Sequence, residues 1–492
     1  MSQINKVVIA GGGTAGWMAA ASISKLVGRR LDITLIESET IGTIGVGEAT
    51  IPSLLTINRL LKISEPEFLR ETKATFKLGI AFENWRKLGH RYIHSFGDTG
   101  TGCWAAGFHH FWLRGVNEGF AKPYGDYCLE LQAAEMSRFG LLSSHKINYA
   151  YHLDATQYAA YLRRLAEQAG VRRVEGIIDQ VSLDPSNGNI THLLTKSGQI
   201  IEGDLFIDCT GFRGRLIAEA LGTGFEDWSH WLPCDRAVAL QTESVSPAIP
   251  YTRAIPHGAG WPWRIPLQHR VGNGLVYCSK YQTNEEALTL LRRNTQGDAT
   301  TEPRFIRFTT GQRQQHWTKN CIALGLSSGF IEPLESTSIH FIQNGLLWLL
   351  LMFPSDTILE SVRNEYNAKM RREAERIRDF IVMHYHLTER DDTEFWRYCR
   401  GMDIPESLKH RMSLFGSSGT VFKDQDDVFA ENSWVQVMMG QGLIPKTYHP
   451  IVDQMSSVEL SEFLRQNLER VDQSLSQLPD HFNFVKQYAQ SG

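Results

Sequence analysis

The sequence predicts an α/β fold that begins in a parallel β-sheet and ends in a mainly helical region. Three observations predict it: a strand–glycine loop–helix–strand pattern near the N-terminus, alternating strand and helix patterns in the middle, and helical periodicity after about residue 355. At 492 residues the chain is long enough for two or three domains. Its 42% hydrophobic and 21% charged residues are typical of a soluble globular protein.

The N-terminal pattern starts with a short β-type run at residues 6–10, followed by the glycine loop 11–16, Gly-Gly-Gly-Thr-Ala-Gly. A helical pattern covers residues 17–26, and a second strand pattern covers residues 31–37. That strand ends in the carboxylate of Glu37, 21 residues beyond the last loop glycine. This order and spacing are those of a Rossmann-like dinucleotide-binding unit.

The glycine loop has the residue types needed to hold a pyrophosphate. Gly11 permits the tight turn, Gly13 lets the backbone approach the phosphates, and Gly16 lets the helix pack closely on the strand. The helix N-terminus then faces the phosphates, and Glu37 can bind a ribose hydroxyl. A glycine-rich turn that binds nothing is the alternative, but strand, spacing and acid all agree with nucleotide binding.

Two later segments favour FAD over NAD. Residues 198–214 form a turn, a buried strand ending at Asp208 and a Thr-Gly pair, and they resemble the second cofactor element of flavin monooxygenase-type folds. Residues 320–335 run from a strand through a loop into a helix, whose start can place N–H groups and positive dipole beside a reduced flavin. The three expected cofactor elements thus cover residues 7–52, 174–214 and 320–341. Elements spaced so widely along the chain fit FAD better than they fit a compact NAD domain.

The remaining segments predict a substrate-side sheet and a helical C-terminal region. Residues 60–200 and 225–320 alternate helix and strand patterns, which favours a second sheet, and residues 413–431 form a polar, glycine-containing loop. Amphipathic helices are expected at 364–383, 456–475 and 480–489. We therefore expect two domains: 1–355 for FAD binding with an interleaved sheet, and 356–492, mainly helical, covering the substrate site.

Composition excludes several classes of function. A net charge of −4 with scattered signs argues against a nucleic-acid partner. The seven cysteines lack Cys-x-x-Cys spacing, so we expect no metal site and no disulfide frame, and a reducing cytoplasm. The longest apolar run, 346–353, is much shorter than the roughly 20 residues that a membrane span needs, and no secretory signal pattern is visible. We therefore expect a cytoplasmic protein with no membrane partner.

The heptapeptide 260–266, Gly-Trp-Pro-Trp-Arg-Ile-Pro, is the most informative feature of the chain. Trp261 and Trp263 lie two residues apart and are followed by Ile265-Pro266, so they predict a rigid, bulky wall at a strand end. Large aromatic side chains in a core are the structural alternative. The pattern Trp-x-Trp-x-Ile-Pro resembles the signature of flavin-dependent halogenases of the tryptophan-halogenase type.

Further motifs carry the same resemblance from residue 7 to about residue 445. They are Gly-Gly-Gly-Thr-Ala-Gly-Trp-Met at 11–18, Ile-Gly-Val-Gly-Glu-Ala-Thr-Ile-Pro at 44–52, Phe76-Lys77, Glu-Pro-Leu-Glu-Ser-Thr at 332–337, and Arg-Asp-Asp-Thr at 390–393 with Phe395-Trp396. Any one of these motifs would be suggestive only, whereas together they are highly specific.

The resemblance implies a two-component, FADH2-dependent halogenase. A separate NAD(P)H-dependent flavin reductase supplies the FADH2, which with O2 and halide (bromide or chloride) gives hypohalous acid that travels through the protein to the substrate. The family's essential lysine follows a phenylalanine, which matches Lys77. A buried ammonium can make the halogen more electrophilic by hydrogen bonding, or a neutral lysine can become a haloamine. A solvated surface lysine is the alternative.

The resemblance also assigns residues of the halide site. Glu335 matches the second catalytic residue, which can orient the halogenating species and accept the proton that the arene loses. A helix-entry acid that favours the dipole is the structural alternative. Thr337 and Ser338 match the pair whose backbone amides flank the halide. A glycine is usual in the family where Ser338 stands, so we expect bromide to be handled at least as well as chloride.

The resemblance implies a barrier and a substrate slot. Trp261 and Trp263, with Pro266, separate the flavin from the substrate, and His94 and Phe96 flank the aromatic substrate. The residues expected to bind FAD are Gly11, Gly13, Thr14, Ala15, Gly16, Glu37, Ser38, Ile41, Ala49, Val181, Leu326 and Ile339.

The region that grips the substrate departs from the family pattern. Tryptophan-specific members carry paired tyrosines and a glutamate that hold the amino-acid backbone, and no such set is recognisable in residues 413–445. We therefore expect a more open site that accepts indole or a larger aromatic ring in preference to free tryptophan.

Two other functions share part of the pattern. A two-component flavin-dependent aromatic hydroxylase would use the same FAD elements but would need neither Lys77 beside Glu335 nor the tryptophan wall. A non-catalytic flavin-binding redox module would bind FAD and gain nothing from Lys77. Halide dependence separates the first from a halogenase. A homodimer is common in the family, although nothing in the sequence marks an interface.

Overall fold

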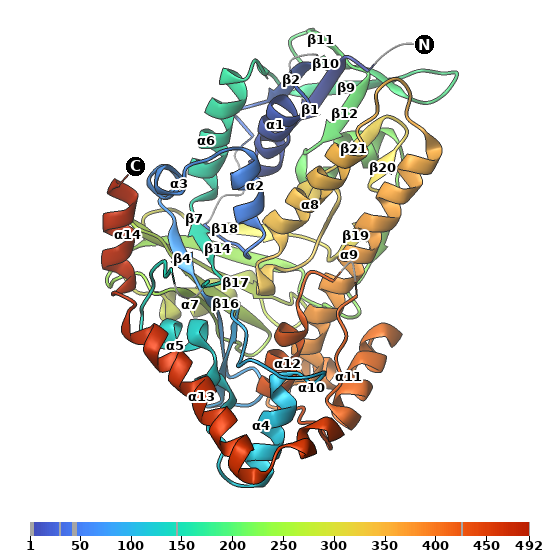
Figure 1. Cartoon of the computed structure of the whole chain (residues 1–492). Helices are drawn as coiled ribbons and strands as arrows, with labels where there is room; N and C mark the ends of the chain where they lie inside the picture. Colours follow the sequence, from blue (N-terminus) through green and yellow to red (C-terminus); the bar gives the residue numbers. More distant parts are fainter. Residues whose placement is uncertain (1–3, 29–30, 42–46, 144–145, 425–426, 492) are drawn as a thin grey trace. The chain divides into compact units, whose positions relative to one another are not determined.

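A computed structural model describes the chain apart from residues 1–3, 29–30, 42–46, 144–145, 425–426 and 492 (Figure 1). The chain divides into two compact units, each assembled from three separate segments. The first unit comprises Met1–Ala74, Leu153–Asp235 and Arg307–Glu375, and the second comprises Thr75–His152, Arg236–Ile306 and Arg376–Gly492. The expected domain boundary after residue 355 lies inside the third segment of the first unit. The functional division at that residue stays a prediction.

The core of the first unit is a six-stranded sheet in the order β20-β21-β12-β1-β2-β8. Its strands are β20 (Trp317–Thr318), β21 (Cys321–Ala323), β12 (Leu205–Asp208), β1 (Lys6–Ala10), β2 (Asp32–Glu37) and β8 (Arg172–Glu175). All neighbours pair in parallel except β20, which is antiparallel to β21. Almost every residue of β1, β2 and β12 is buried, as expected for strands covered on both faces.

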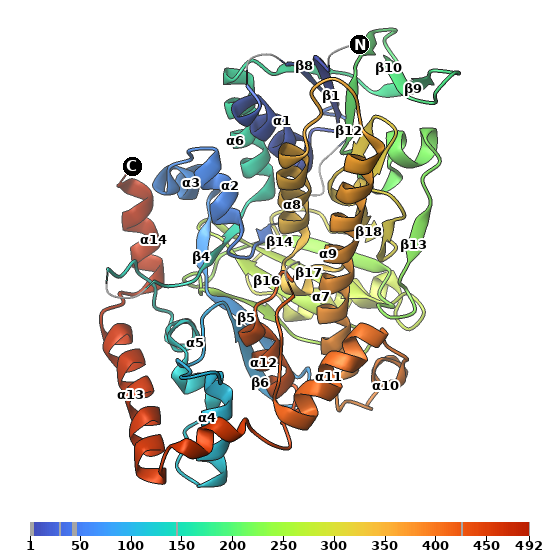
Figure 2. The ribbon, with the colours of Figure 1, turned by 45° about the vertical axis from the view of Figure 1, so that its right-hand side comes forward.

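The helices of the first unit are α1 (Thr14–Leu26), α2 (Leu54–Leu60), α3 (Glu65–Thr72), α6 (Ala155–Gln168), the π-helix η3 (Arg215–Ala220), α8 (Ser338–Leu351) and the first part of α9 (Glu360–His386). Helix α1 packs against both α6 and α8 (Figures 1 and 2). Short strands complete the unit: β3 (Glu48–Ala49), the sheet of β9 (Ile178–Leu183), β10 (Ile190–Thr195) and β11 (Ile200–Glu202), and the sheet of β13 (Phe225–Asp227), β19 (Gly311–Arg313) and β22 (Gly329–Phe330).

The core of the second unit is a seven-stranded sheet in the order β18-β14-β17-β16-β15-β5-β6. Its strands are β18 (Arg304–Arg307), β14 (Arg236–Glu243), β17 (Arg270–Tyr277), β16 (Gly260–Pro266), β15 (Tyr251–Ala254), β5 (Gly79–Glu83) and β6 (Arg91–Ser95). The short strand β4 (Thr75–Lys77) pairs antiparallel with β7 (Ala150–Leu153). Its helices are α4 (Phe108–Asn117), α5 (Leu129–Glu135), α7 (Asn284–Asn294), α10 (Glu394–Gly401), α11 (Glu406–Ser418), α12 (Glu431–Gly440), α13 (Ser457–Ser476) and α14 (His481–Gln490).

This architecture confirms the predicted α/β fold and corrects three of its details. Residues 153–200, expected in the substrate-side sheet, belong to the first unit. The heptapeptide 260–266 is not at a strand end, because it forms the whole of β16 between β15 and β17. The segment 413–431 is not all loop: α11 continues to Ser418 because Phe415 is buried, and it ends where Gly419 takes the left-handed conformation, with φ 72°. Among the described helices, none is long and apolar enough to cross a membrane.

Candidate active site

The glycine loop between β1 and α1 is packed so closely that its first and last glycines leave no room for a side chain. A Cβ at Gly11, which has φ +106°, would lie 2.2 Å from the carbonyl oxygen of Cys209, the residue after β12. A Cβ at Gly16 would lie 1.8 Å from the carbonyl oxygen of Gly11. At Gly13, by contrast, a Cβ would meet nothing within 4 Å, so this part of the loop backbone faces open space. The loop therefore fits a pyrophosphate approaching at Gly13.

Glu37 is held in place at the end of β2. Its carboxylate accepts a hydrogen bond of 2.7 Å from Nε of Arg173 and lies 3.7 Å from the guanidinium of Arg163. A Cβ at Gly12 would lie 1.5 Å from this carboxylate, so only glycine fits between the loop and the acid. The sequence analysis missed both arginines. The parallel pairing of β8 with β2 brings Arg173 to Glu37, and that pairing is not visible in the sequence.

Asp208, at the end of β12, joins the second and third cofactor elements. Its buried carboxylate accepts hydrogen bonds from Thr210 and from the backbone N–H groups of Leu216 and Ile217 in η3. Its carbonyl oxygen accepts a hydrogen bond from the hydroxyl of Ser327. The carboxylate is thus used to hold the backbone together. Segments from three distant parts of the sequence consequently meet at the carboxyl edge of the sheet, where ligands of such folds bind.

The third element leads from β21 into α8. The 3-10 turn η4 (Gly325–Ser327), which includes Leu326, lies against the glycine loop, since a Cβ at Gly325 would lie 2.9 Å from that of Ala15. The next turn, η5 (Pro333–Glu335), ends in the fully buried Glu335. Thr337 is the N-cap of α8, and Ser338 and Ile339 are its first residues. The first N–H groups of a helix point away from it without intrahelical acceptors, so this start can face an anion.

For the other residues expected to bind FAD, the structure shows burial and local contacts but no feature specific to a cofactor. Ala49 is buried in β3, and Val181 packs at the edge of the apolar core under β1, β2 and β12. Ser38 shares a hydrogen bond of 2.9 Å with the hydroxyl of Thr40, and Ile41 is 64% exposed. Residues 44–46 of the expected 44–52 motif lie outside the described residues. The close-packed loop and its open side at Gly13 are what fit FAD.

Lys77, in the second unit, is fully buried on β4, whereas lysines are mostly exposed. Its ammonium lies 5.1 Å from the ring centroid of Phe96, within the range of a cation–π interaction. The residue expected to act on the halogen and one of the two residues expected to flank the substrate are therefore neighbours.

His152 lies beside Lys77 in the antiparallel pair of β4 and β7. Burial, followed by the positive charge of Lys77, lowers the pKa of His152 well below its ordinary value. Its Nε2 lies 2.9 Å from the hydroxyl of Thr252. The hydroxyl of Thr75, on the same strand as Lys77, donates a hydrogen bond of 2.9 Å to the carbonyl of Pro266. The lysine strand is thereby fixed to the end of the tryptophan heptapeptide.

Phe76 anchors the other face of the lysine strand in an aromatic cluster. Its ring stacks on Phe139 at 4.0 Å between centroids and lies 5.8 Å from Phe484 and 6.1 Å from Tyr488, both on α14. His481, the first residue of α14, donates a hydrogen bond of 2.8 Å from Nδ1 to the carbonyl of Ala248. The sequence analysis missed this role of the C-terminal helix. Its aromatic residues 482, 484 and 488 were the available signal.

Trp261 and Trp263 lie in the interior of the sheet of the second unit. Both side chains are buried, and their ring centroids are 6.1 Å apart. Trp263 covers Gly274, its partner on β17, where a Cβ would lie 2.0 Å from the indole. Trp85 extends the aromatic layer, with its centroid 6.4 Å from that of Trp261. The wall is therefore rigid because it is built on a central strand.

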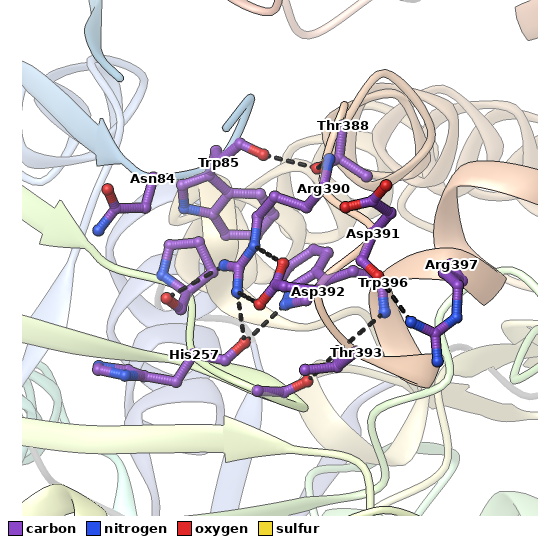
Figure 3. A network of polar contacts seen from close by, with 12 residues as sticks. Asn84, Trp85, His257, Thr388, Arg390, Asp391, Asp392, Thr393, Trp396 and Arg397 are labelled. Atoms are coloured by element: carbon purple, nitrogen blue, oxygen red, sulfur yellow. Dashed lines mark hydrogen bonds and ion pairs between the residues drawn. The ribbon is translucent and has the colours of Figure 1, made fainter. Parts of the chain in front are cut away.

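The motif at 390–396 holds the β15–β16 loop that precedes the wall (Figure 3). The Arg390 guanidinium donates to both oxygens of Asp392, at 2.8 and 2.7 Å, and to the carbonyl of His257 at 3.4 Å. It also lies 4.6 Å from the ring centroid of Trp396, whose Nε1 donates to the same carbonyl at 2.6 Å. Thr393 donates a hydrogen bond of 2.6 Å to the carbonyl of Gly258. Within the described residues, the side chains of this motif thus bind the backbone of the β15–β16 loop.

His94, expected to flank the substrate, is buried on β6 among aromatic rings. Its ring centroid lies 5.5 Å from that of Phe380 and 6.2 Å from that of Phe429, and these two phenylalanines stack at 3.7 Å. Phe429 comes from the segment that lacks the family's tyrosine pair. Arg411 fixes this region by an ion pair of 2.9 Å with the buried Asp427. The sequence analysis missed Phe380 and Phe429, which meet only in the folded chain.

Comparison with known proteins gives matches over nearly the whole chain. The tryptophan halogenase family model matches residues 6–457. A solved flavin-dependent halogenase of Xanthomonas campestris, Xcc4156, is 56% identical over 99% of this chain and 98% of its own, with a TM-score of 0.97. BrvH, a flavin-dependent halogenase of Brevundimonas sp. BAL3, is 42% identical over 99% of both chains, with a TM-score of 0.94. The tryptophan 7-halogenase RebH of Lentzea aerocolonigenes is 34% identical over 99% of both sequences.

The fold and these similarities define a flavin-dependent enzyme of the halogenase class. The chain belongs to the tryptophan halogenase family, which confirms the resemblance expected from its motifs. Its cofactor is accordingly FAD, used with halide and O2. Within the described residues, no group of three or more His, Cys, Asp or Glu side chains is arranged to hold a metal ion.

We predict that Gly12→Ala weakens FAD binding at least about tenfold, because the new Cβ would collide with the carboxylate of Glu37 and force the loop or the acid to move. Titration of the protein with FAD, followed by flavin fluorescence, measures the change. Gly401→Ala is the matched control, since a Cβ there would meet nothing within 4 Å. Equal FAD affinity in Gly12→Ala and the wild type would contradict the prediction.

We predict that Arg390→Ala lowers the free energy of unfolding by about 2–3 kcal/mol, because it removes the guanidinium that donates to the Asp392 carboxylate and to the carbonyl of Pro256. Urea unfolding followed by tryptophan fluorescence measures the loss. Arg397→Ala, at an exposed hydrogen bond of the same segment, should change stability by less than about 0.5 kcal/mol. A similar effect of both variants would show that Arg390 has no special role.

We predict that His481 makes the free energy of unfolding fall at acid pH. Burial lowers its pKa from 6.5 to about 4, so the folded protein holds the ring neutral. Its contribution is therefore complete above pH 6.5 and is lost as the pH falls from 6.5 toward 4, because the unfolded chain takes up the proton first. The loss should be on the order of 3 kcal/mol. Urea unfolding at several pH values gives the free energy of unfolding as a function of pH. Between pH 6.5 and 4 this free energy should fall less steeply in His481→Gln than in the wild type, and the same pH dependence in both would refute the assignment.

Proposed function

We propose that this enzyme makes hypohalous acid from bromide or chloride and that Lys77 directs the halogen onto an electron-rich aromatic ring such as indole. The observation that carries the proposal is the complete burial of Lys77 with its ammonium 5.1 Å from Phe96. Lysines are mostly exposed, and this buried lysine lies beside a residue expected to flank the substrate. The bound flavin, reduced and then exposed to O2, supplies the oxidising power.

Lys77 would act as a hydrogen-bond donor to hypohalous acid or, in its neutral form, as a haloamine. Donation to the oxygen of hypohalous acid draws electron density away from the halogen and makes it a better electrophile. His152, held neutral by burial, adds no second positive charge next to this ammonium. The stack of Phe76 on Phe139 keeps the strand and therefore the ammonium in place. This environment supports the role of Lys77 in either mechanism.

Glu335, Thr337 and Ser338 are the proposed residues of the halide side. The buried carboxylate of Glu335 would accept the proton that leaves the halogenated ring. The amide groups of Thr337 and Ser338, at the start of the 14-residue helix α8, would hold the halide by hydrogen bonding and helix dipole. Ser338 adds a side chain where glycine is usual in the family and so changes the volume and polarity of this place. Bromide is also more easily oxidised than chloride, so we expect it to be handled at least as well.

The proposed substrate is an indole or another aromatic ring without an amino-acid group. Curated relatives include tryptophan 6- and 7-halogenases, which match this chain at 36% and 34% identity. The tyrosine pair and glutamate by which tryptophan-specific members grip free tryptophan are not recognisable in residues 413–445. Phe429 and Phe380, stacked beside His94, offer aromatic faces and no charge. Trp261, Trp263 and Pro266 would keep the flavin from oxidising such a ring directly.

The proposed partner is a separate NAD(P)H-dependent flavin reductase that delivers FADH2 by diffusion. No NADPH motif is apparent in the sequence, and the resemblance implies none. We also propose a cytoplasmic enzyme, in keeping with the scattered cysteines, and a homodimer as the oligomer common in the family.

The decisive experiment supplies the enzyme with FAD, a generic flavin reductase, NADH and air, and follows products by mass spectrometry. We predict halogenated indole in both chloride and bromide, slower or no turnover of tryptophan, and at least about a hundredfold loss in Lys77→Ala, since the group that activates the halogen is gone. Lys146→Ala, at an exposed lysine of the same unit, is the control. A hydroxylated product independent of halide would identify a hydroxylase, and tryptophan turned over faster than indole would refute the substrate.

A further inference from the structure

Three segments of the first unit meet at the side chain of His340, in the first turn of α8. Its Nδ1 lies 2.8 Å from the hydroxyl oxygen of Ser53, at the start of α2. Its Nε2 lies 2.8 Å from Oε1 of Glu373, on α9. The side chains of His340 and Glu373 are 13% and 4% exposed. The two ring nitrogens are therefore held from opposite sides in a nearly dry environment.

The chemistry of the three groups fixes how they share protons. A carboxylate only accepts hydrogen bonds, so its closeness favours a proton on Nε2 of His340. Nδ1 then either accepts the hydrogen of the Ser53 hydroxyl or, in a protonated ring, donates to its oxygen. Gln343 lies three residues further along the helix, and its Nε2 donates a hydrogen bond of 2.7 Å to the carbonyl of Ser53. The first turn of α8 is therefore tied to Ser53 by two side chains, and the ring of His340 lies against Glu373 on its other side.

These ties matter because the start of α8 has no ordinary cap. The N-cap residue Thr337 makes no side-chain hydrogen bond to the helix, although threonine commonly does so. Ser336, just before it, takes the left-handed conformation, with φ 61°. Helix ends without a cap tend to fray. The contacts of His340 therefore replace a cap in holding the backbone amides of Thr337 and Ser338 in position.

We propose that His340 is a positioning residue for halide: held between Ser53 and Glu373, it fixes the first turn of α8 and so sets the affinity of the enzyme for the halide ion. The inference rests on the proposed halide site at Thr337 and Ser338. Amide groups bind an anion strongly only when they are held in one orientation, because ordering them afterwards costs conformational entropy.

The test measures halide KM, kcat at saturating halide and FAD affinity in variants of His340, in the full-length enzyme with FAD and constant ionic strength. His340→Phe removes both contacts. His340→Asn keeps an amide near the position of Nδ1 and so the contact with Ser53, whereas His340→Gln reaches toward Glu373. We expect His340→Phe to raise the KM for bromide and chloride at least about tenfold. The amide variants should lie between it and the wild type, with kcat and FAD affinity changed less than about threefold.

Two further variants make the result unambiguous. Glu373→Gln should raise the halide KM in the same direction, whereas Glu360→Gln, an exposed residue in the first turn of the same helix α9, should not. Ser338→Val tests the proposed halide site itself, because its larger side chain would crowd the anion. A raised halide KM in Ser338→Val together with a normal halide KM in all His340 variants would overturn the role of His340 but leave the proposed halide site standing. No effect of Ser338→Val would instead overturn the proposed halide site.

The pattern across measurements separates positioning from general damage. If His340→Phe fails to fold, as judged by circular dichroism, the two amide variants still decide the question. Parallel losses of FAD affinity and halide affinity in those variants would mean that His340 only supports the fold, which would overturn the inference. A selective rise in halide KM, partly restored by Asn or Gln, would support it.

Discussion

The parallel pairing of β1 with β2 on one side and β12 on the other is the constraint on which the cofactor half of this enzyme depends. It brings segments from the N-terminus and from beyond residue 200 to one carboxyl edge, where Gly11 closes against Cys209. Because the approach leaves no room for a Cβ, the loop must be glycine, and its remaining open side at Gly13 is where a pyrophosphate fits. Asp208 then joins that edge to the turn leading to α8.

The second unit holds one ammonium group, that of Lys77, completely buried. Lys77 is surrounded by an aromatic ring at 5.1 Å and by a histidine that burial holds neutral. The strand that carries it is fixed at Phe76 by α14 and at Thr75 by the carbonyl of Pro266. The buried ammonium is therefore held in one place, as the role proposed for Lys77 requires.

Polar groups that look functional in the sequence often turn out to hold backbone segments in this protein. The carboxylate of Asp208 is satisfied by the start of η3, and the motif at 390–396 pins the loop before the tryptophan wall. His340 combines both characters, since its contacts replace a helix cap at the place proposed for the halide. Buried polar groups must be hydrogen-bonded, so many of the most specific motifs of a family are also structural.

The sequence by itself determined the α/β class and the family, and it singled out the glycine loop, Glu37 and Lys77 as candidate site residues. These features are carried by local spacing and by residue types that few other sites need. The sequence could not determine that 260–266 is a central strand, that 413–418 is helical, or that Arg173, Phe380 and Phe484 surround the predicted residues. Those features depend on strand order and on contacts between residues far apart along the chain. Only tertiary structure decides them, since no local pattern records which distant segment provides the other half of a contact.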